Sequence, residues 1–112
     1  MVDGKLYIDL HGYPRATYSS PNELLGWYLE QDIQSSCVTC DLILALCYEV
    51  ESGIKEQWVG TGNAHTVTIE SKKVTIENEF DADAKPCTVS LDQFRETLTS
   101  WKQLIRSRSN NL

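Results

Sequence analysis

Hydrophobic and polar residues alternate one by one near the start of the chain. Leu6, Ile8 and Leu10 lie on one side of this pattern, and after a turn over residues 11–14 the alternation resumes over 16–18. A period of two is typical of a β-strand with one buried face. The pattern therefore predicts an N-terminal β-hairpin.

The spacing then changes to that of a helix. Pro21 follows a serine and precedes Glu23 by two positions, which is the arrangement of a capping box with proline in the first turn. We therefore expect a helix that begins at Pro21 and ends near Gln34. Its hydrophobic residues form one stripe, and Glu30 and Asp32 are expected to project away from that stripe into solvent.

A second helical segment follows Ser35 and Ser36, and it ends at Gly53. Hydrophobic residues recur in it at intervals of three and four. Leu42 and Leu46 widen the apolar face, so we expect burial on more than one side. The alternative to this helical pair is one long helix that is kinked at the two serines.

Beyond Gly53 the period returns to two, in three short segments over residues 57–59, 65–69 and 73–76. Turns at 62–63 and 71–72 would join them into an antiparallel meander with matched cross-strand pairs. The expected pairs are Glu70 with Lys73, Ile69 with Val74, Thr68 with Thr75, Val67 with Ile76, and Trp58 with Val67.

The last third of the chain predicts one more helix. Residues 87–89 form either an edge strand or a loop, and Ser90 with Gln93 makes another capping box. An amphipathic stripe follows, and the polar tail from about residue 107 to 112 is expected to fray. Its members are Leu91, Phe94, Leu98, Trp101 and Ile105. The fold class is therefore α+β: a mainly antiparallel sheet, an N-terminal hairpin plus a three-stranded meander, with a helical pair inserted and a C-terminal amphipathic helix.

Length and charge narrow the class of protein. The 112 residues, 41% of them hydrophobic, fit a single domain over 1–112. No Lys or Arg occurs between Ala16 and Ile54, and the net charge of −6 disfavours direct binding of nucleic acid. The longest apolar run, Leu42–Tyr48, is too short to cross a membrane, and no secretory signal is recognisable. We expect a cytoplasmic protein whose partners are basic proteins.

The four cysteines, at positions 37, 40, 47 and 87, are expected to be free thiols, since no export signal is recognisable. Cys37 and Cys40 have the CxxC spacing of redox and zinc sites. Most of the cysteines, however, fall on the apolar stripe of the second helical segment, where cysteine packs as a small hydrophobe. Core packing is the favoured interpretation, with a zinc site or redox chemistry as alternatives, and no cofactor is expected.

Candidate catalytic groups are sparse. His11 and His65 are the only imidazoles, and neither belongs to a nucleophile elbow, a phosphate-binding loop or a metal-binding helix motif. We therefore do not expect an enzyme.

Two sets of residues are candidates for binding a partner. The first is a series of acids at alternate positions, which would share one face if the preceding strand continued; such a series either keeps an edge soluble or recognises a basic protein. Its members are Glu77, Glu79, Asp81 and Asp83. The second combines an aromatic beside the helical stripe with nearby acids, and its tryptophan either anchors an interface or packs at a core margin. Its members are Trp27, Glu30 and Asp32.

The order of these motifs resembles a known group of small bacterial proteins. The segments that carry the resemblance are Glu23–Tyr28, Trp58–Gly62, Val74–Asn78 and Leu91–Phe94, followed by a helix with Trp101. They look like the YacL-type family and like related immunity proteins of contact-dependent growth inhibition (CdiI-like). The resemblance implies a cytosolic inhibitor that binds a cognate toxin domain, often a nuclease, and blocks its active site or substrate surface. The alternatives are an uncharacterised YacL-like housekeeping protein and, third, a zinc- or thiol-dependent protein.

Overall fold

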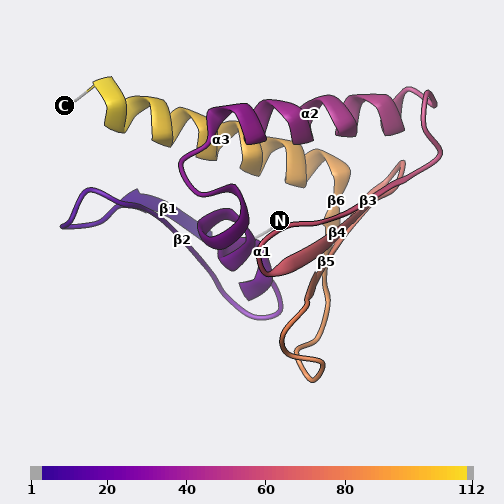
Figure 1. Cartoon of the computed structure of the whole chain (residues 1–112), viewed down its shortest axis with the longest axis horizontal. Coiled ribbons are helices and arrows are strands. Elements are labelled where there is room, and N and C mark those ends of the chain that lie inside the picture. The colour runs from indigo at the N-terminus through magenta and orange to yellow at the C-terminus, as the bar shows by residue number, and fades with distance from the viewer. Residues whose placement is uncertain (1–3, 111–112) are drawn as a thin grey trace.

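The computed structural model describes residues 4–110, and its fold is α+β, as the sequence predicted (Figure 1). Strands β1 (Gly4–Ile8) and β2 (Pro14–Tyr18) pair antiparallel as a separate two-stranded sheet, which confirms the N-terminal hairpin. Leu6 lies opposite Ala16 in this register.

The first helix begins later than the capping pattern indicated. Helix α1 spans Glu23–Tyr28 and has Asn22 at its N-cap without a side-chain capping bond, so the predicted start at Pro21 is wrong. The backbone N–H of Asn22 donates instead to the Ser19 carbonyl at 2.9 Å, which closes a turn before the helix. At Gly26 the helix approaches β2 so closely that an added Cβ would lie 2.7 Å from the Ala16 carbonyl oxygen.

The helix continues as a wider π-helical turn, η1 (Leu29–Ile33). The N–H of Gln34 donates to the Leu29 carbonyl at 2.8 Å, a five-residue spacing, and Gln34 itself has a φ of 57° that ends the segment. The first helical segment therefore ends where the sequence predicted.

Helix α2 (Cys37–Glu51) is separate from the first, which confirms the helical pair. Its N-cap is Ser36, whose Oγ accepts from the Thr39 N–H at 3.0 Å. The expectation that α2 is buried on more than one side is wrong, since Leu42 is 58% exposed. A single face of the helix packs into the core, so apolar residues on its other face meet solvent.

The remaining strands form one antiparallel sheet in the order β3-β4-β5-β6. The strands are β3 (Trp58–Thr61), β4 (His65–Ile69), β5 (Lys73–Asn78) and β6 (Cys87–Ser90). The predicted pairs between β4 and β5 are confirmed, and the short run after the acidic series is an edge strand, β6.

The predicted register between β3 and β4 is wrong by two residues. Trp58 lies opposite Ile69 rather than Val67, because a bond from the Gly62 N–H to the His65 carbonyl places the two-residue turn at Asn63 and Ala64, one position later than predicted. A slip of two keeps the same side of each strand facing the core. Trp58 accordingly still packs against the core.

Helix α3 (Leu91–Asn110) closes the fold. Ser90 caps it, its Oγ accepting from the Gln93 N–H at 3.0 Å, and the predicted stripe is buried. The helix continues through residues 107–110, so the predicted fraying is wrong there, and residues 111–112 lie outside the described part of the chain. Arg108 helps to hold this last turn by donating to the Ser35 Oγ at 3.2 Å.

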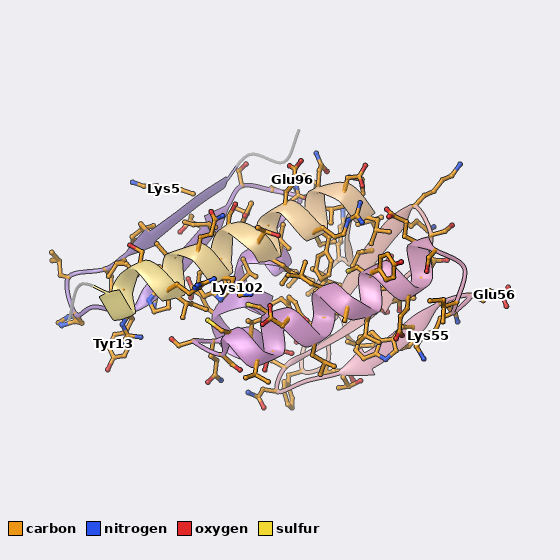
Figure 2. All side chains as sticks on the ribbon, turned by 90° about the horizontal axis from the view of Figure 1, so that it is seen from above. Lys5, Tyr13, Lys55, Glu56, Glu96 and Lys102 are labelled. Atoms are coloured by element: carbon orange, nitrogen blue, oxygen red, sulfur yellow. The ribbon has the colours of Figure 1, made fainter. Side chains whose placement is uncertain are left out.

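Helices α2 and α3 lie side by side in one layer, with the two sheets and α1 beneath them (Figures 1 and 2). Lys102 of α3 bridges them through Asp41 at 2.5 Å, and Arg95 reaches Glu51 at 2.8 Å. Within residues 4–110, no helix is both long and apolar enough to cross a membrane.

Replacement of Trp101 by phenylalanine tests this packing. The Trp101 ring is completely buried, and its Nε1–H donates to the Gln34 carbonyl at 2.8 Å. Phenylalanine removes both volume and the hydrogen bond, so we expect W101F to lower the free energy of unfolding by about 2 kcal/mol. Urea denaturation measures the change. W27F, at a half-exposed tryptophan, should change it by less than about 0.5 kcal/mol, and equal effects of the two variants would contradict the assignment.

Candidate protein-binding groove

A groove with a volume of about 240 Å³ lies between the start of α1 and the loop that joins β5 to β6. Trp27 forms one wall and is 48% exposed, although most large side chains of the first helical segment are buried. The loop residues project below the helices and the sheet in Figure 1. The full lining is Ser20, Pro21, Glu23, Leu24, Trp27, Asp81, Ala84 and Lys85.

The groove joins residues that the sequence placed in two separate candidate sets. Trp27 belongs to the helical set and Asp81 to the acidic series, yet both line the same hollow. An exposed aromatic ring beside carboxylates is the composition of a protein-interface anchor. A contact from the Cys87 Sγ to the Asn22 Oδ1 at 3.4 Å joins β6 to the residue before α1.

The acidic series does not form one face. Strand β5 ends at Asn78, whose Oδ1 accepts from the N–H groups of Phe80 and Asp81 at 2.8 and 3.1 Å and turns the chain. The expectation that four alternating acids point the same way is therefore wrong. Glu79 contacts the Thr66 hydroxyl, whereas Asp81 lines the groove.

The charges of the acidic series are nevertheless not neutralised within the protein. In the described part of the chain, no Lys or Arg forms an ion pair within 4.0 Å with any of the four acids of the series. Asp81 and Asp83 are both exposed, and the Asp81 carboxylate accepts from the Asp83 N–H at 3.1 Å. The loop therefore presents negative charge to solvent.

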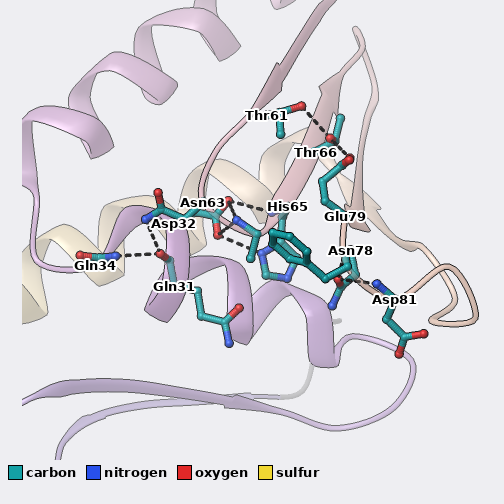
Figure 3. A network of polar contacts seen from close by, with 12 residues as sticks. Gln31, Asp32, Gln34, Thr61, Asn63, His65, Thr66, Asn78, Glu79 and Asp81 are labelled. Atoms are coloured by element: carbon teal, nitrogen blue, oxygen red, sulfur yellow. Dashed lines mark hydrogen bonds and ion pairs between the residues drawn. The ribbon is translucent and has the colours of Figure 1, made fainter.

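Asp32 has a different position from the one predicted. Its side chain is 3% exposed and lies between η1 and the β3–β4 turn (Figure 3). Its carboxylate accepts from the backbone N–H groups of Ala64 and His65, at 3.2 and 3.0 Å, and contacts the His65 Nδ1 at 3.0 Å. The prediction that Asp32 projects into solvent is wrong, and its role is to hold the turn.

The sequence contained the signal for this burial. Asp32 follows Tyr28 by four residues and Leu25 by seven, which places it at the centre of the apolar stripe rather than beside it. His65 likewise shares the phase of Val67 and Ile69 on β4, which is the phase of the core. Two polar residues at inward positions predict a buried pair.

Asp32 and His65 have the side chains of two members of a catalytic triad. Their surroundings, however, indicate a structural role. His65 is completely buried, its ring packs edge-on against Tyr28 with centroids 6.2 Å apart, and its Nε2 has no hydrogen-bond partner among residues 4–110. The His65 ring is therefore closed to solvent. The pair is therefore positioned to stabilise the turn.

The carboxylate of Glu30 also forms its polar contacts within the protein. Its carboxylate accepts from the Ala16 N–H at 2.7 Å and lies 3.4 Å from the Arg15 Nε, and its side chain is only 19% exposed. It joins η1 to β2, and its charge is compensated by Arg15. Of the second candidate set, only Trp27 faces solvent.

Two residues of the groove are not predicted as site residues by the sequence. Glu23 is explained there by helix capping, and Lys85 carries no distinguishing pattern. An asparagine at a strand end followed by alternating acids could have indicated the turn, since asparagine side chains accept from backbone N–H groups two residues on.

All four cysteines are free thiols, and Cys40, Cys47 and Cys87 are buried. Burial raises the pKa of the Cys40 and Cys47 thiols to about 11. The packing interpretation is confirmed for these two side chains, which belong to the core. Among residues 4–110 no group of three or more His, Cys, Asp or Glu side chains is arranged to hold one metal ion.

Comparison with known proteins gives one distant match. The chain is 23% identical to UPF0231 protein YE0706 of Yersinia enterocolitica over 121 aligned positions, which cover 96% of this chain and all of that protein. No family model matches the chain, and no solved structure matches it significantly. The match supports distant homology to a UPF0231 protein, whose name states no activity and contains neither of the family names used above.

Replacement of Asp32 by asparagine tests the buried pair. Asparagine retains one acceptor but directs an N–H₂ group at donors, so we expect D32N to lower the free energy of unfolding by roughly 3 kcal/mol. Urea denaturation checks this value. The matched control is D83N in the exposed loop, expected within about 0.5 kcal/mol of the parent protein. A neutral effect of D32N would contradict the assigned role.

Thiol reactivity tests the burial of the cysteines. With a disulfide reagent at pH 8, the half-buried Cys37 should react quickly, whereas Cys40 and Cys47, whose raised pKa keeps them protonated at that pH, should react only as the protein opens. If the C37S variant lacks the fast phase, that phase is the reaction of Cys37. Rapid modification of all four thiols in the native protein would contradict the structure.

Proposed function

We propose that the protein acts by stoichiometric binding of a basic protein partner, without catalysis, in the cytoplasm. The observation that carries the proposal is the groove that places the exposed Trp27 beside Glu23 and Asp81. An aromatic anchor supplies buried area in a complex, and unpaired carboxylates around it accelerate encounter with positive charge. The same negative charge disfavours a phosphate backbone as the direct ligand.

The finer proposal names the partner as a cognate toxin domain, with a basic nuclease as the favoured kind. It rests on the resemblance to immunity proteins of contact-dependent growth inhibition and on the uncompensated acids of the β5–β6 loop. A nuclease must bind phosphates with a positive surface, and an acidic loop can cover such a surface. Partner binding would then block the substrate surface of the toxin.

The second candidate is a housekeeping protein of the YacL type. It rests on the resemblance of the sequence motifs to that family. Gene neighbourhood separates the two candidates: immunity requires a nearby gene for a large secreted protein with a toxic C-terminal domain. Absence of such a gene would remove the immunity proposal.

Charge reversal in the loop tests the proposed recognition. We expect that co-expression of the parent protein with the toxin domain restores bacterial growth, and that E79K/D81K/D83K loses this rescue, because the variant repels a basic partner. Growth curves and the dissociation constant of the purified pair are the measurements. Circular dichroism and urea denaturation check that the variant remains folded.

The control variant is E56K/E70K/E96K, which changes the net charge equally. Glu56 precedes β3 and Glu96 lies on α3 (Figure 2). Glu70 lies in the β4–β5 turn, and none of the three lines the groove. This control should retain rescue. Equal loss of rescue by both variants would indicate that net charge, and not the loop, determines binding.

A further inference from the structure

We propose that the groove between α1 and the β5–β6 loop is a pocket for one arginine side chain of the partner. This inference rests on the proposed function, and it names the chemistry that the groove selects. The groove combines an exposed tryptophan with two carboxylates.

The shape of the groove suits a long side chain with a flat end. Its volume of about 240 Å³ is enough for one side chain but not for a strand or a helix. Leu24, Pro21 and Ala84 provide apolar surface on which methylene groups can pack, and the indole of Trp27 provides a flat wall. A guanidinium group stacks on such a face through cation–π attraction, which is strongest with tryptophan.

The charges of the lining select a cation. Glu23 and Asp81 supply two carboxylates from segments far apart in the sequence, and Lys85 supplies one positive charge. The lining is therefore net negative, and it would repel an acidic side chain. Neither carboxylate forms an ion pair within 4.0 Å in residues 4–110, so both can accept from a ligand.

Arginine fits this lining better than lysine. Its planar guanidinium carries five donors, which can bond carboxylates in its plane while its face stacks on an aromatic ring. The ammonium of lysine is more strongly hydrated and cannot stack. The Asp81 Oδ1 already accepts from the Asp83 N–H at 3.1 Å, which holds the carboxylate in place before a ligand arrives.

The test uses the full-length protein and small probes. We would label the protein with ¹⁵N and titrate it with Nα-acetyl-arginine methylamide, and in parallel with the lysine and citrulline analogues. The arginine probe should move the Trp27 indole and Ala84 amide signals saturably, without moving the buried Trp101. The citrulline analogue, which keeps the shape but lacks the charge, should bind at least about tenfold more weakly.

Variants link the signal to the pocket. E23Q/D81N should weaken the arginine probe by about tenfold or more, since it removes both charges while the amide introduced at position 81 keeps an oxygen for the Asp83 N–H. E56Q/E96Q, which removes two exposed charges outside the groove, is the matched control and should bind the probe as the parent protein does. The absence of saturable movement of Trp27, or equal binding of the three probes, would overturn the proposal.

The same variants separate this inference from the proposed function. If E23Q/D81N neutralises the toxin domain with unchanged affinity, the arginine pocket is wrong and the proposed function stands. If the arginine probe binds as expected but no basic protein is neutralised, the pocket stands and the proposed function is wrong. If both proposals hold, alanine substitution of each exposed arginine of the bound toxin domain should identify one arginine that the pocket binds. Its loss should weaken the complex with the parent protein but not the complex with E23Q/D81N.

Discussion

The carboxylate of Asp32 is the buried charge that fixes the first helical segment against the sheet. A buried carboxylate costs several kcal/mol unless donors surround it, and here two backbone N–H groups and the His65 ring supply them. Those donors exist only if the β3–β4 turn lies directly over η1. The need to satisfy one charge therefore determines where the turn lies and why Trp58 pairs with Ile69.

This constraint extends from the turn to the groove. Asp32 accepts a hydrogen bond from the Ala64 N–H. The carbonyl of Ala64 accepts another, at 2.9 Å, from the N–H of Glu79, which is the first residue of the β5–β6 loop. Asn78 then turns the chain toward the groove, and Cys87 returns it to Asn22 at the start of α1. Both ends of the loop are thus held by side chains, which lowers the ordering cost of binding a ligand.

Local hydrogen bonding explains which parts of the fold the sequence predicted. The caps at Ser36 and Ser90 satisfy N–H groups three residues away, and the β4–β5 hairpin is set by a two-residue turn, so neighbouring residues sufficed. The β3–β4 register, in contrast, depends on Asp32, a partner more than 30 positions away in sequence. The groove itself joins residues 20–27 with 81–85, a proximity that no local pattern contains.

The ion pairs determine which of the many acidic residues leave negative charge uncompensated at the surface. Cations from elsewhere compensate Glu30, Asp41 and Glu51 in the segment without Lys or Arg, whereas Glu23 forms no ion pair within residues 4–110 and lines the groove. Asp32 is buried and hydrogen-bonded. The acids at the end of β5 and in the loop that follows receive no such compensation from residues 4–110, although they occupy a part of the chain that contains lysines. Negative charge is therefore concentrated by the fold around the groove, where an external cation can lower its electrostatic energy.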